Sequence, residues 1–115
     1  TEFNYIFANN DMMAQGCYNA LKDAGKENIP IVSTGGSPDG FKMLQDGIEA
    51  ANMTAPVSIQ GVKTFMNLYN KVALGEDPAE KFTALPVIPV SADDTSSYIA
   101  WDDYAAAYKY LGENK

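Results

Sequence analysis

Histidine and arginine are both absent from this sequence, and Cys17 is its single cysteine. Without histidine, the chain cannot form a Ser-His-Asp or Cys-His nucleophile system, a histidine-ligated zinc site or the usual proton shuttle near neutral pH. With one cysteine, it can form neither an internal disulfide nor a cysteine-rich metal site. The sequence therefore predicts that the protein is not an enzyme and that it has no catalytic residue, metal site or cofactor.

Positive charge is also scarce in the sequence. The eight basic residues are all lysine, and with 15 acidic residues they give a formal net charge of −7. A nucleic-acid-binding surface needs clustered cations, so no nucleic-acid partner is expected. No apolar run approaches the roughly 20 residues that span a bilayer. What remains is a 115-residue chain with 46% hydrophobic and 20% charged residues, which is a composition typical of one globular domain or less.

Short apolar segments alternate with segments of helical periodicity along the chain. The expected extended segments are residues 4–8, 29–33, 50–54 and 82–90, and the last is restricted by its prolines to a sheet edge or a crossover. The expected helices follow the capping residues Asp11, Ser37, Ser58, and either Asp102 or Asp103. This alternation predicts an α/β fold in which a parallel sheet has helices on both faces.

Two further expectations concern the third helix and the aromatic residues near the C-terminus. The third helix is expected to end at Gly75 and to bury its apolar side chains, which are Val62, Phe65, Met66, Tyr69 and Val72. Tyr98 and Trp101 form the densest aromatic cluster. The favoured interpretation is that they bury part of the last helix, and the alternative is a platform on which a sugar stacks.

Ligands of parallel α/β sheets bind at the carboxyl ends of the strands, beside the helix N-termini. Three loops are expected there, at residues 9–11, 34–37 and 54–58. In the first loop, if Asp11 caps the helix, the amide of Asn10 can offer a donor and an acceptor to a hydroxyl-rich ligand. The second loop contains Gly35 and Gly36 without a following Gly-Lys-Ser/Thr, so a tight turn is favoured over phosphate binding.

Two stretches of this sequence resemble the type I periplasmic sugar-binding proteins, and among them the ribose-binding group. They are IFANNDMMAQG at residues 6–16 and ALKDAGK at residues 20–26, and the likeness extends to about residue 90. The resemblance implies two α/β lobes, joined by crossing segments, that close on a small polar ligand. It implies a solute-binding component of an ABC importer, with a membrane permease as partner, in the periplasm or held outside the cell by a lipoprotein anchor.

The resemblance also implies which residues contact the ligand. Asn10 matches a contact residue of the family, and Gly35 stands where the family usually has an aspartate. A backbone amide of Gly35 or Gly36 would then replace the missing carboxylate. The third contact matches Ala55, or Thr54 if the gap is placed differently. The expected ligand is sugar-like but differs from a plain aldopentose, and a furanosyl compound, a polyol or a nucleoside would fit.

By the same resemblance, the chain is the C-terminal half of such a protein. Residues 1–55 are expected to form a βαβαβ segment of the second lobe, residues 56–90 a crossing segment with a helix and strand of the first lobe, and residues 91–115 a tail and helix returning to the second lobe. The missing N-terminal half, or a second copy of the chain, is expected to cover its apolar faces. The alternative is the effector-binding domain of a LacI-type transcriptional regulator, although Gly25-Lys26 is more typical of the binding proteins.

Overall fold

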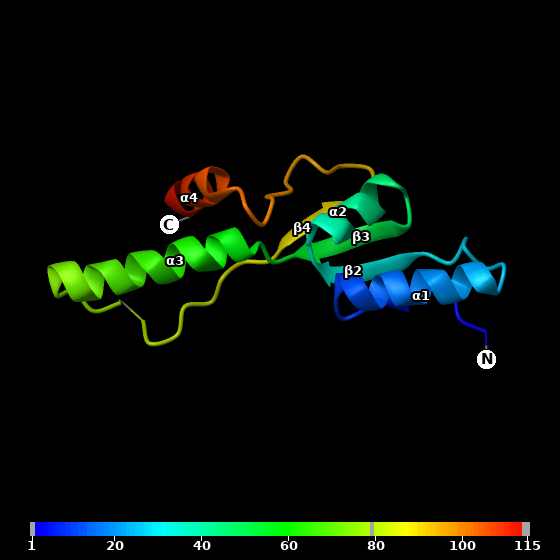
Figure 1. The fold of residues 1–115 in the computed structure, drawn as a ribbon, viewed down its shortest axis with the longest axis horizontal. Helices are drawn as coiled ribbons and strands as arrows, with labels where there is room; N and C mark the ends of the chain where they lie inside the picture. Colours follow the sequence, from blue (N-terminus) through cyan, green and yellow to red (C-terminus); the bar gives the residue numbers. More distant parts are fainter. Residues whose placement is uncertain (1, 79, 114–115) are drawn as a thin grey trace.

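A four-stranded sheet with helices beside it forms the centre of the computed structural model, which describes residues 2–78 and 80–113 (Figure 1). The strands are β1 (Ile6–Phe7), β2 (Ile31–Gly35), β3 (Glu49–Thr54) and β4 (Ile88–Ser91). The helices are α1 (Asp11–Asp23), α2 (Pro38–Gln45), α3 (Val57–Tyr69), which continues as the π-helical η1 (Asn70–Leu74), and α4 (Tyr104–Glu113). Residues 1, 79 and 114–115, which belong to the predicted segments 1–55, 56–90 and 91–115, lie outside the described residues.

The predicted α/β class with a parallel sheet is confirmed. The strands follow the order β1-β2-β3-β4, in which the first three are parallel and β4 pairs antiparallel with β3. The edge position predicted for the proline-containing segment is also confirmed, because β4 is the last strand of the sheet. The register places Ser33 beside Asn52 and Gly35 beside Thr54, which sets the geometry of the site described below.

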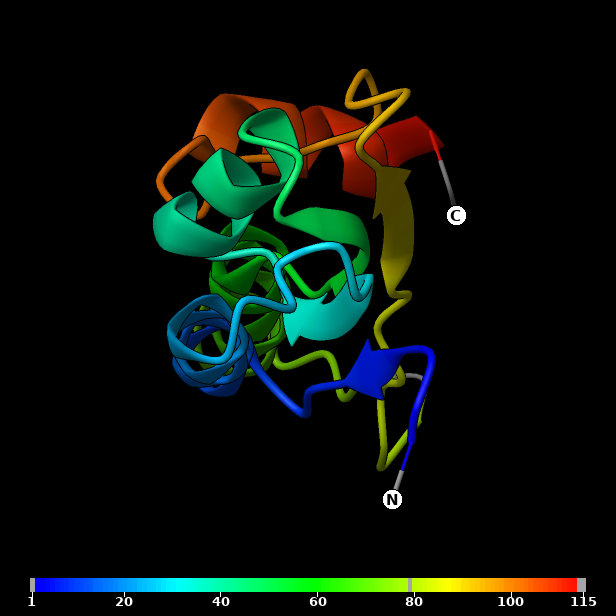
Figure 2. The same ribbon diagram turned by 90° about the vertical axis from the view of Figure 1, so that its right-hand side faces the viewer.

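Helices α1 and α2 lie next to each other on one face of the sheet (Figure 2). Leu21 of α1, Ile31 of β2 and Met43 of α2 belong to the buried core on that face. A second cluster joins α2, α3, β4 and α4, and its buried members are Leu44, Ile59, Ile88, Val90 and Ala107. The prediction placed helices on both faces of the sheet. In the structure, α1 and α2 share one face, and Phe7, on the opposite face, is 60% exposed.

The capping residues of the helices agree only in part with the sequence prediction. Ser37 caps α2 as predicted, and of the two candidates for α4 it is Asp103 that accepts from Ala106 N. The prediction for α1 was wrong, because Asn10 is the cap, accepting from Met13 N at 2.9 Å, while Asp11 is drawn into a buried cluster. Ser58 is not a cap either; α3 begins at Val57, and the Ser58 hydroxyl donates to the carbonyl of Ala100.

The far half of α3 is much more exposed than its periodicity predicts. Phe65 is 66% exposed, Tyr69 52% and Val72 76%, so the expectation that these side chains are buried was wrong. Figure 1 shows the reason: α3 and η1 extend away from the sheet, and α4 lies beside only the first part of α3. The predicted end of this helix is correct, since Gly75 adopts the left-handed conformation, with φ of 73°.

Candidate functional site

The five residues predicted to contact a ligand lie at the carboxyl ends of the three parallel strands. Asn10 follows β1, Gly35 ends β2 and Gly36 follows it, and Thr54 ends β3 with Ala55 next to it. Adjacent strand ends are joined directly, because Ala55 N donates to the carbonyl of Gly35 at 3.0 Å. The Thr34 hydroxyl of β2 donates to the carbonyl of Asn9 at 2.9 Å, which joins the loop after β1 to β2. The structure therefore brings the predicted residues to one edge of the sheet.

These residues differ in what they can offer to a ligand. Asn10 is exposed, and because its Oδ1 caps α1, its amide N–H groups are the part that can donate to a ligand. Thr54 is fully buried, and its hydroxyl donates to the carbonyl of Ile88 at 2.8 Å. Ala55 is half-buried and has only backbone groups to offer. The role of each residue in binding stays a prediction.

Gly35 and Gly36, which we call the glycine turn, have backbone conformations that favour glycine. Their φ angles are 129° and 74°. A Cβ atom on Gly36 would lie 2.5 Å from the Cβ of Thr54, and one on Gly35 would lie 2.9 Å from Oδ2 of Asp11. The carboxylate of Asp11 thus occupies the space beside Gly35, where the family resemblance leads one to expect an aspartate.

Four polar side chains that the sequence analysis did not single out as a group form a buried cluster below the glycine turn. This buried polar cluster consists of Asp11, Ser33, Glu49 and Asn52, and none of the four is more than 5% exposed. Asn52 Nδ2 lies 2.7 Å from Asp11 Oδ1, 2.7 Å from Ser33 Oγ and 3.0 Å from Glu49 Oε2. The backbone N–H of Ser37, at the start of α2, donates to Asp11 Oδ2 at 2.7 Å. Asp11 thus links α1, both central strands and the N-terminus of α2.

Burial raises the pKa of Glu49 above its ordinary value, and the nearby carboxylate of Asp11 acts in the same direction. The hydrogen bonds from Asn52 and Ser33 act against this shift because they stabilise the carboxylate, but the effect of burial is larger. Ser33 Oγ lies 2.9 Å from Glu49 Oε1 and 3.2 Å from Asp11 Oδ1, and its hydroxyl has only one hydrogen to donate. Both carboxyl groups therefore lie within hydrogen-bond distance of the one hydrogen of the Ser33 hydroxyl.

The raised pKa of Glu49 makes stability depend on pH. Below the pKa of glutamate in the unfolded chain, about 4.3, both states bind the proton and the contribution of Glu49 to stability is fully present. As the pH rises through the folded pKa, this contribution is lost, with a slope of at most about 1.4 kcal/mol per pH unit. We expect Glu49→Gln to remove this decline in urea unfolding experiments between pH 4 and 8. Equal pH profiles for Glu49→Gln, the exposed control Glu27→Gln and the unmodified chain would contradict the raised pKa of Glu49.

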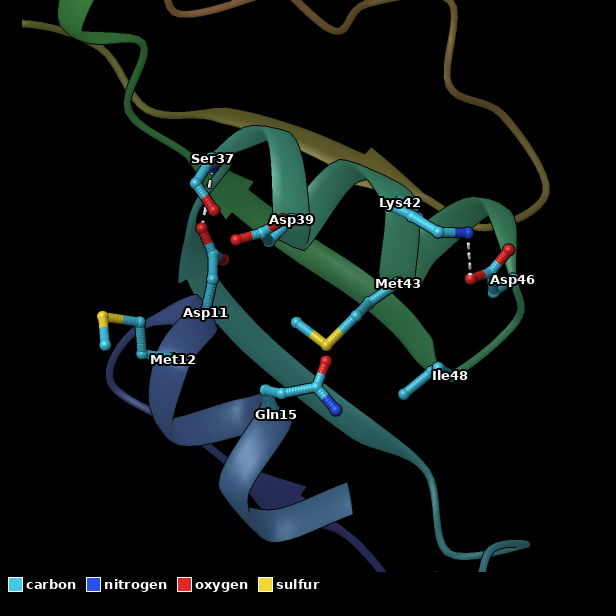
Figure 3. A pocket seen from close by; sticks show the side chains of 9 residues that line it. All are labelled: Asp11, Met12, Gln15, Ser37, Asp39, Lys42, Met43, Asp46 and Ile48. Carbon is cyan, nitrogen blue, oxygen red and sulfur yellow. Dashed lines mark hydrogen bonds and ion pairs between the residues drawn. The ribbon is translucent and has the colours of Figure 1, made fainter. Parts of the chain in front are cut away.

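A pocket of about 340 Å³ lies between α1 and α2, beside the buried polar cluster (Figure 3). Its lining residues are Asp11, Met12, Gln15, Ser37, Asp39, Lys42, Met43, Asp46 and Ile48. Lys42 forms an ion pair with Asp46 at 2.7 Å on its rim. None of the predicted ligand contacts lines this pocket, so it is separate from the edge at which they converge.

Among the described residues, no group of three or more histidine, cysteine, aspartate or glutamate side chains could hold a metal ion, and no helix is long and apolar enough to cross a membrane.

The tail between β4 and α4 covers the glycine turn, a contact that the sequence analysis did not foresee. The Tyr98 hydroxyl donates to the carbonyl of Gly36 at 3.1 Å, and Trp101 Nε1 donates to the carbonyl of Gly35 at 3.3 Å. The ring of Tyr98 stacks on Phe41 of α2, with the centroids 3.8 Å apart. The sequence shows this aromatic cluster but not its partners, because the two residues are more than 60 positions away from the turn.

No family model matches the chain, but curated proteins and a solved structure are similar to it. Ribose import binding protein RbsB from Escherichia coli (strain K12) is 38% identical over 80 residues, which cover 67% of this chain and 26% of that protein. RbsB from Salmonella typhimurium is 38% identical over 77 residues, with the same coverage of 67% and 26%. A crystal structure from Mycobacterium smegmatis has a TM-score of 0.61 at 23% identity and covers 98% of this chain and 36% of that chain.

The chain spans about a quarter of the length of the curated relatives it matches. The names of these relatives are those of binding proteins and not of enzymes, which supports the prediction that this chain is not an enzyme. The likeness to the solved structure concerns the fold alone. The mostly parallel α/β sheet is thus consistent with part of a type I periplasmic-binding lobe, in a sequence similar to ribose import binding proteins.

Proposed function

We propose that this chain forms one wall of the ligand cleft of a two-lobed solute-binding protein. The protein binds a sugar or sugar-like molecule and delivers it to the membrane permease of an ABC importer. It acts in the periplasm, or outside the cell on a lipoprotein anchor. The observation that carries the proposal is the convergence of the predicted contacts at the carboxyl edge of the sheet, in a sequence similar to ribose import binding proteins.

The groups at this edge suit a neutral ligand with several hydroxyls. Asn10 supplies amide donors, and the glycine turn and Ala55 supply backbone groups. The Asp11 carboxylate lies beneath the turn, 95% buried, and already accepts hydrogen bonds from α2 and β3, so it supports the site without contacting the ligand. Binding then shifts the protein from an open to a closed state, and no covalent bond is made or broken.

We further propose that residues 1–55 and 91–115 belong to this second lobe and that residues 56–90 cross into the first, except for residues 88–90, which lie in β4 and pair with β3. The support is the exposed apolar surface of α3 and η1, on which Leu68 is 60% and Val72 76% exposed. An apolar groove of about 540 Å³ continues this surface between α3 and α4; it is lined by Gly61, Val62, Phe65, Met66, Tyr104 and Tyr108. Apolar surface of this kind marks an interface, and the first lobe of a longer protein is the partner that we propose.

The variant Asn10→Asp tests the proposed site without removing a helix cap. Aspartate keeps an oxygen that accepts from Met13 N, replaces the N–H donors with a second carboxylate oxygen and adds a negative charge beside Asp11. D-ribose is the probe because the matched relatives are named ribose import binding proteins, although Gly35 in place of the usual aspartate predicts a ligand other than a plain aldopentose. We expect Asn10→Asp to weaken its binding about ten-fold, which corresponds to roughly 1.4 kcal/mol for one lost hydrogen bond. The measurement is a titration of the 15N-labelled chain with D-ribose, in which shifts of the backbone amides report binding.

The matched control is Asn28→Ala, because Asn28 is exposed and precedes β2 at the opposite edge of the sheet. This variant should bind D-ribose as the unmodified chain does. The urea midpoints of both variants should stay close to that of the unmodified chain, so that a change in binding is not a change in folding. If Asn10→Asp bound D-ribose with unchanged affinity, the proposed site would be wrong.

A further inference from the structure

The glycine turn is held by a residue 62 positions further along the chain. The peptide group between Gly36 and Ser37 has a hydrogen-bond partner at each end. The N–H of Ser37 donates to the buried carboxylate of Asp11 at 2.7 Å, and the carbonyl of Gly36 accepts from the Tyr98 hydroxyl at 3.1 Å. The orientation of this peptide group is therefore set on one side by the buried polar cluster and on the other side by the tail.

The carbonyl of Gly35 depends less on the tail than the carbonyl of Gly36 does. Gly35 O accepts from Ala55 N at 3.0 Å in the neighbouring chain segment, and Trp101 Nε1 adds a second donor at 3.3 Å. The donor to Gly36 O is the Tyr98 hydroxyl. Loss of the Tyr98 donor should therefore disturb the turn more than loss of the Trp101 donor.

Tyr98 is itself well placed to hold the turn. Its ring stacks on Phe41 of α2, with centroids 3.8 Å apart and planes 8° apart. The following part of the tail is joined to α3 by the Ser58 hydroxyl, which donates to the carbonyl of Ala100 at 3.0 Å. Burial raises the pKa of Tyr98, and nearby carboxylates act in the same direction, so the hydroxyl keeps its hydrogen at neutral pH and acts as a donor.

Two adjacent glycines have much backbone freedom to lose, because they carry no side chains that restrict or anchor them. A turn that is already fixed loses less of this freedom when it meets a ligand, which lowers the cost of binding. Resting on the proposed function, we infer that Tyr98 is a positioning residue of the candidate site, whose hydroxyl fixes the direction in which the glycine turn presents its backbone groups to the ligand. Tyr98 acts through the turn and does not itself contact the ligand.

The variant Tyr98→Phe removes the hydroxyl and keeps the ring that stacks on Phe41. In the free chain, we expect the carbonyl 13C resonance of Gly36 to move upfield, because its hydrogen bond is lost. The amide order parameter of Gly36 should fall from about 0.85, the value of rigid backbone, toward about 0.6. D-ribose binding, followed by amide shifts, should weaken about three- to ten-fold, because the loosened turn must be ordered again.

Two further variants make the test specific. Trp101→Phe should bind D-ribose within about two-fold of the unmodified chain, since Ala55 N still holds the carbonyl of Gly35. Tyr5→Phe is the matched control, because it also removes a phenolic hydroxyl. Tyr5 is 71% exposed and precedes β1, away from the carboxyl ends of the strands. This control should change neither the Gly36 signals nor the affinity for D-ribose.

The outcomes separate this inference from the proposed function. If Tyr98→Phe bound D-ribose as tightly as the unmodified chain, the inference would be wrong and the proposed site would stand. The inference would also be wrong if affinity fell while the carbonyl resonance and order parameter of Gly36 stayed unchanged, because the effect would not act through the turn. An equal or larger loss in Trp101→Phe would indicate a general loosening of the tail and would likewise overturn it. If D-ribose shifted no amide of the unmodified chain, the proposed function and this inference would both fail.

Discussion

Gly40→Ala is expected to lower the free energy of unfolding by about 3 kcal/mol, although alanine is the better helix former. Gly40 lies in the first turn of α2, directly against Asp11. A Cβ atom at this position would meet the carboxylate carbon of Asp11 and lie 2.5 Å from its Oδ1. Because Asp11 is held by three elements, it cannot move aside without breaking its buried hydrogen bonds. Urea unfolding at neutral pH measures the effect.

Gly16→Ala is the matched control, because Gly16 is also inside a helix but has no atom within 4 Å of the added Cβ. It should raise the free energy of unfolding by roughly 0.5–1 kcal/mol, the usual gain of alanine over glycine in a helix. If both substitutions stabilised the chain equally, the close packing of α2 against Asp11 would be wrong.

Asp11→Ala is expected to destabilise the chain by about 3 kcal/mol, since it removes an acceptor shared by groups on α2, β2 and β3. The N–H of Ser37 is left without its partner, and Asn52 loses one of its short hydrogen bonds. A cavity also forms where the carboxylate was, below the glycine turn. The measurement is again the free energy of unfolding in urea.

Two comparisons separate this effect from a general loss of negative charge. Asp39→Ala removes an exposed acid from the first turn of α2, where the cost should be only about 0.3–1 kcal/mol. In the Asp11→Ala background, Gly40→Ala should lose most of its own cost, because the atoms it would meet are gone. Additive effects of these two substitutions would contradict the direct contact between Gly40 and Asp11.

The sequence alone determined the class of the fold and the place of the candidate site. Strand and helix alternate as in parallel α/β folds, and Ser37 and Gly75 mark helix ends by local geometry. Because parallel strands bring their carboxyl ends to one edge, the convergence of Asn10, Gly35 and Ala55 followed from topology without any knowledge of side-chain contacts.

Only the tertiary structure decided how these residues are used. Local rules predict that Asp11 caps the helix. In the structure its carboxylate is instead buried against β2 and β3 and accepts hydrogen bonds there, so Asn10 is the residue that caps α1. Glu49 and Asn52 look like ordinary strand residues until the register places them beside Ser33 and Asp11. The exposure of α3 and the contact of Trp101 with Gly35 depend on segments far apart in the sequence. Propensity and periodicity describe neighbours along the chain, whereas burial and long-range hydrogen bonds depend on which elements meet in space.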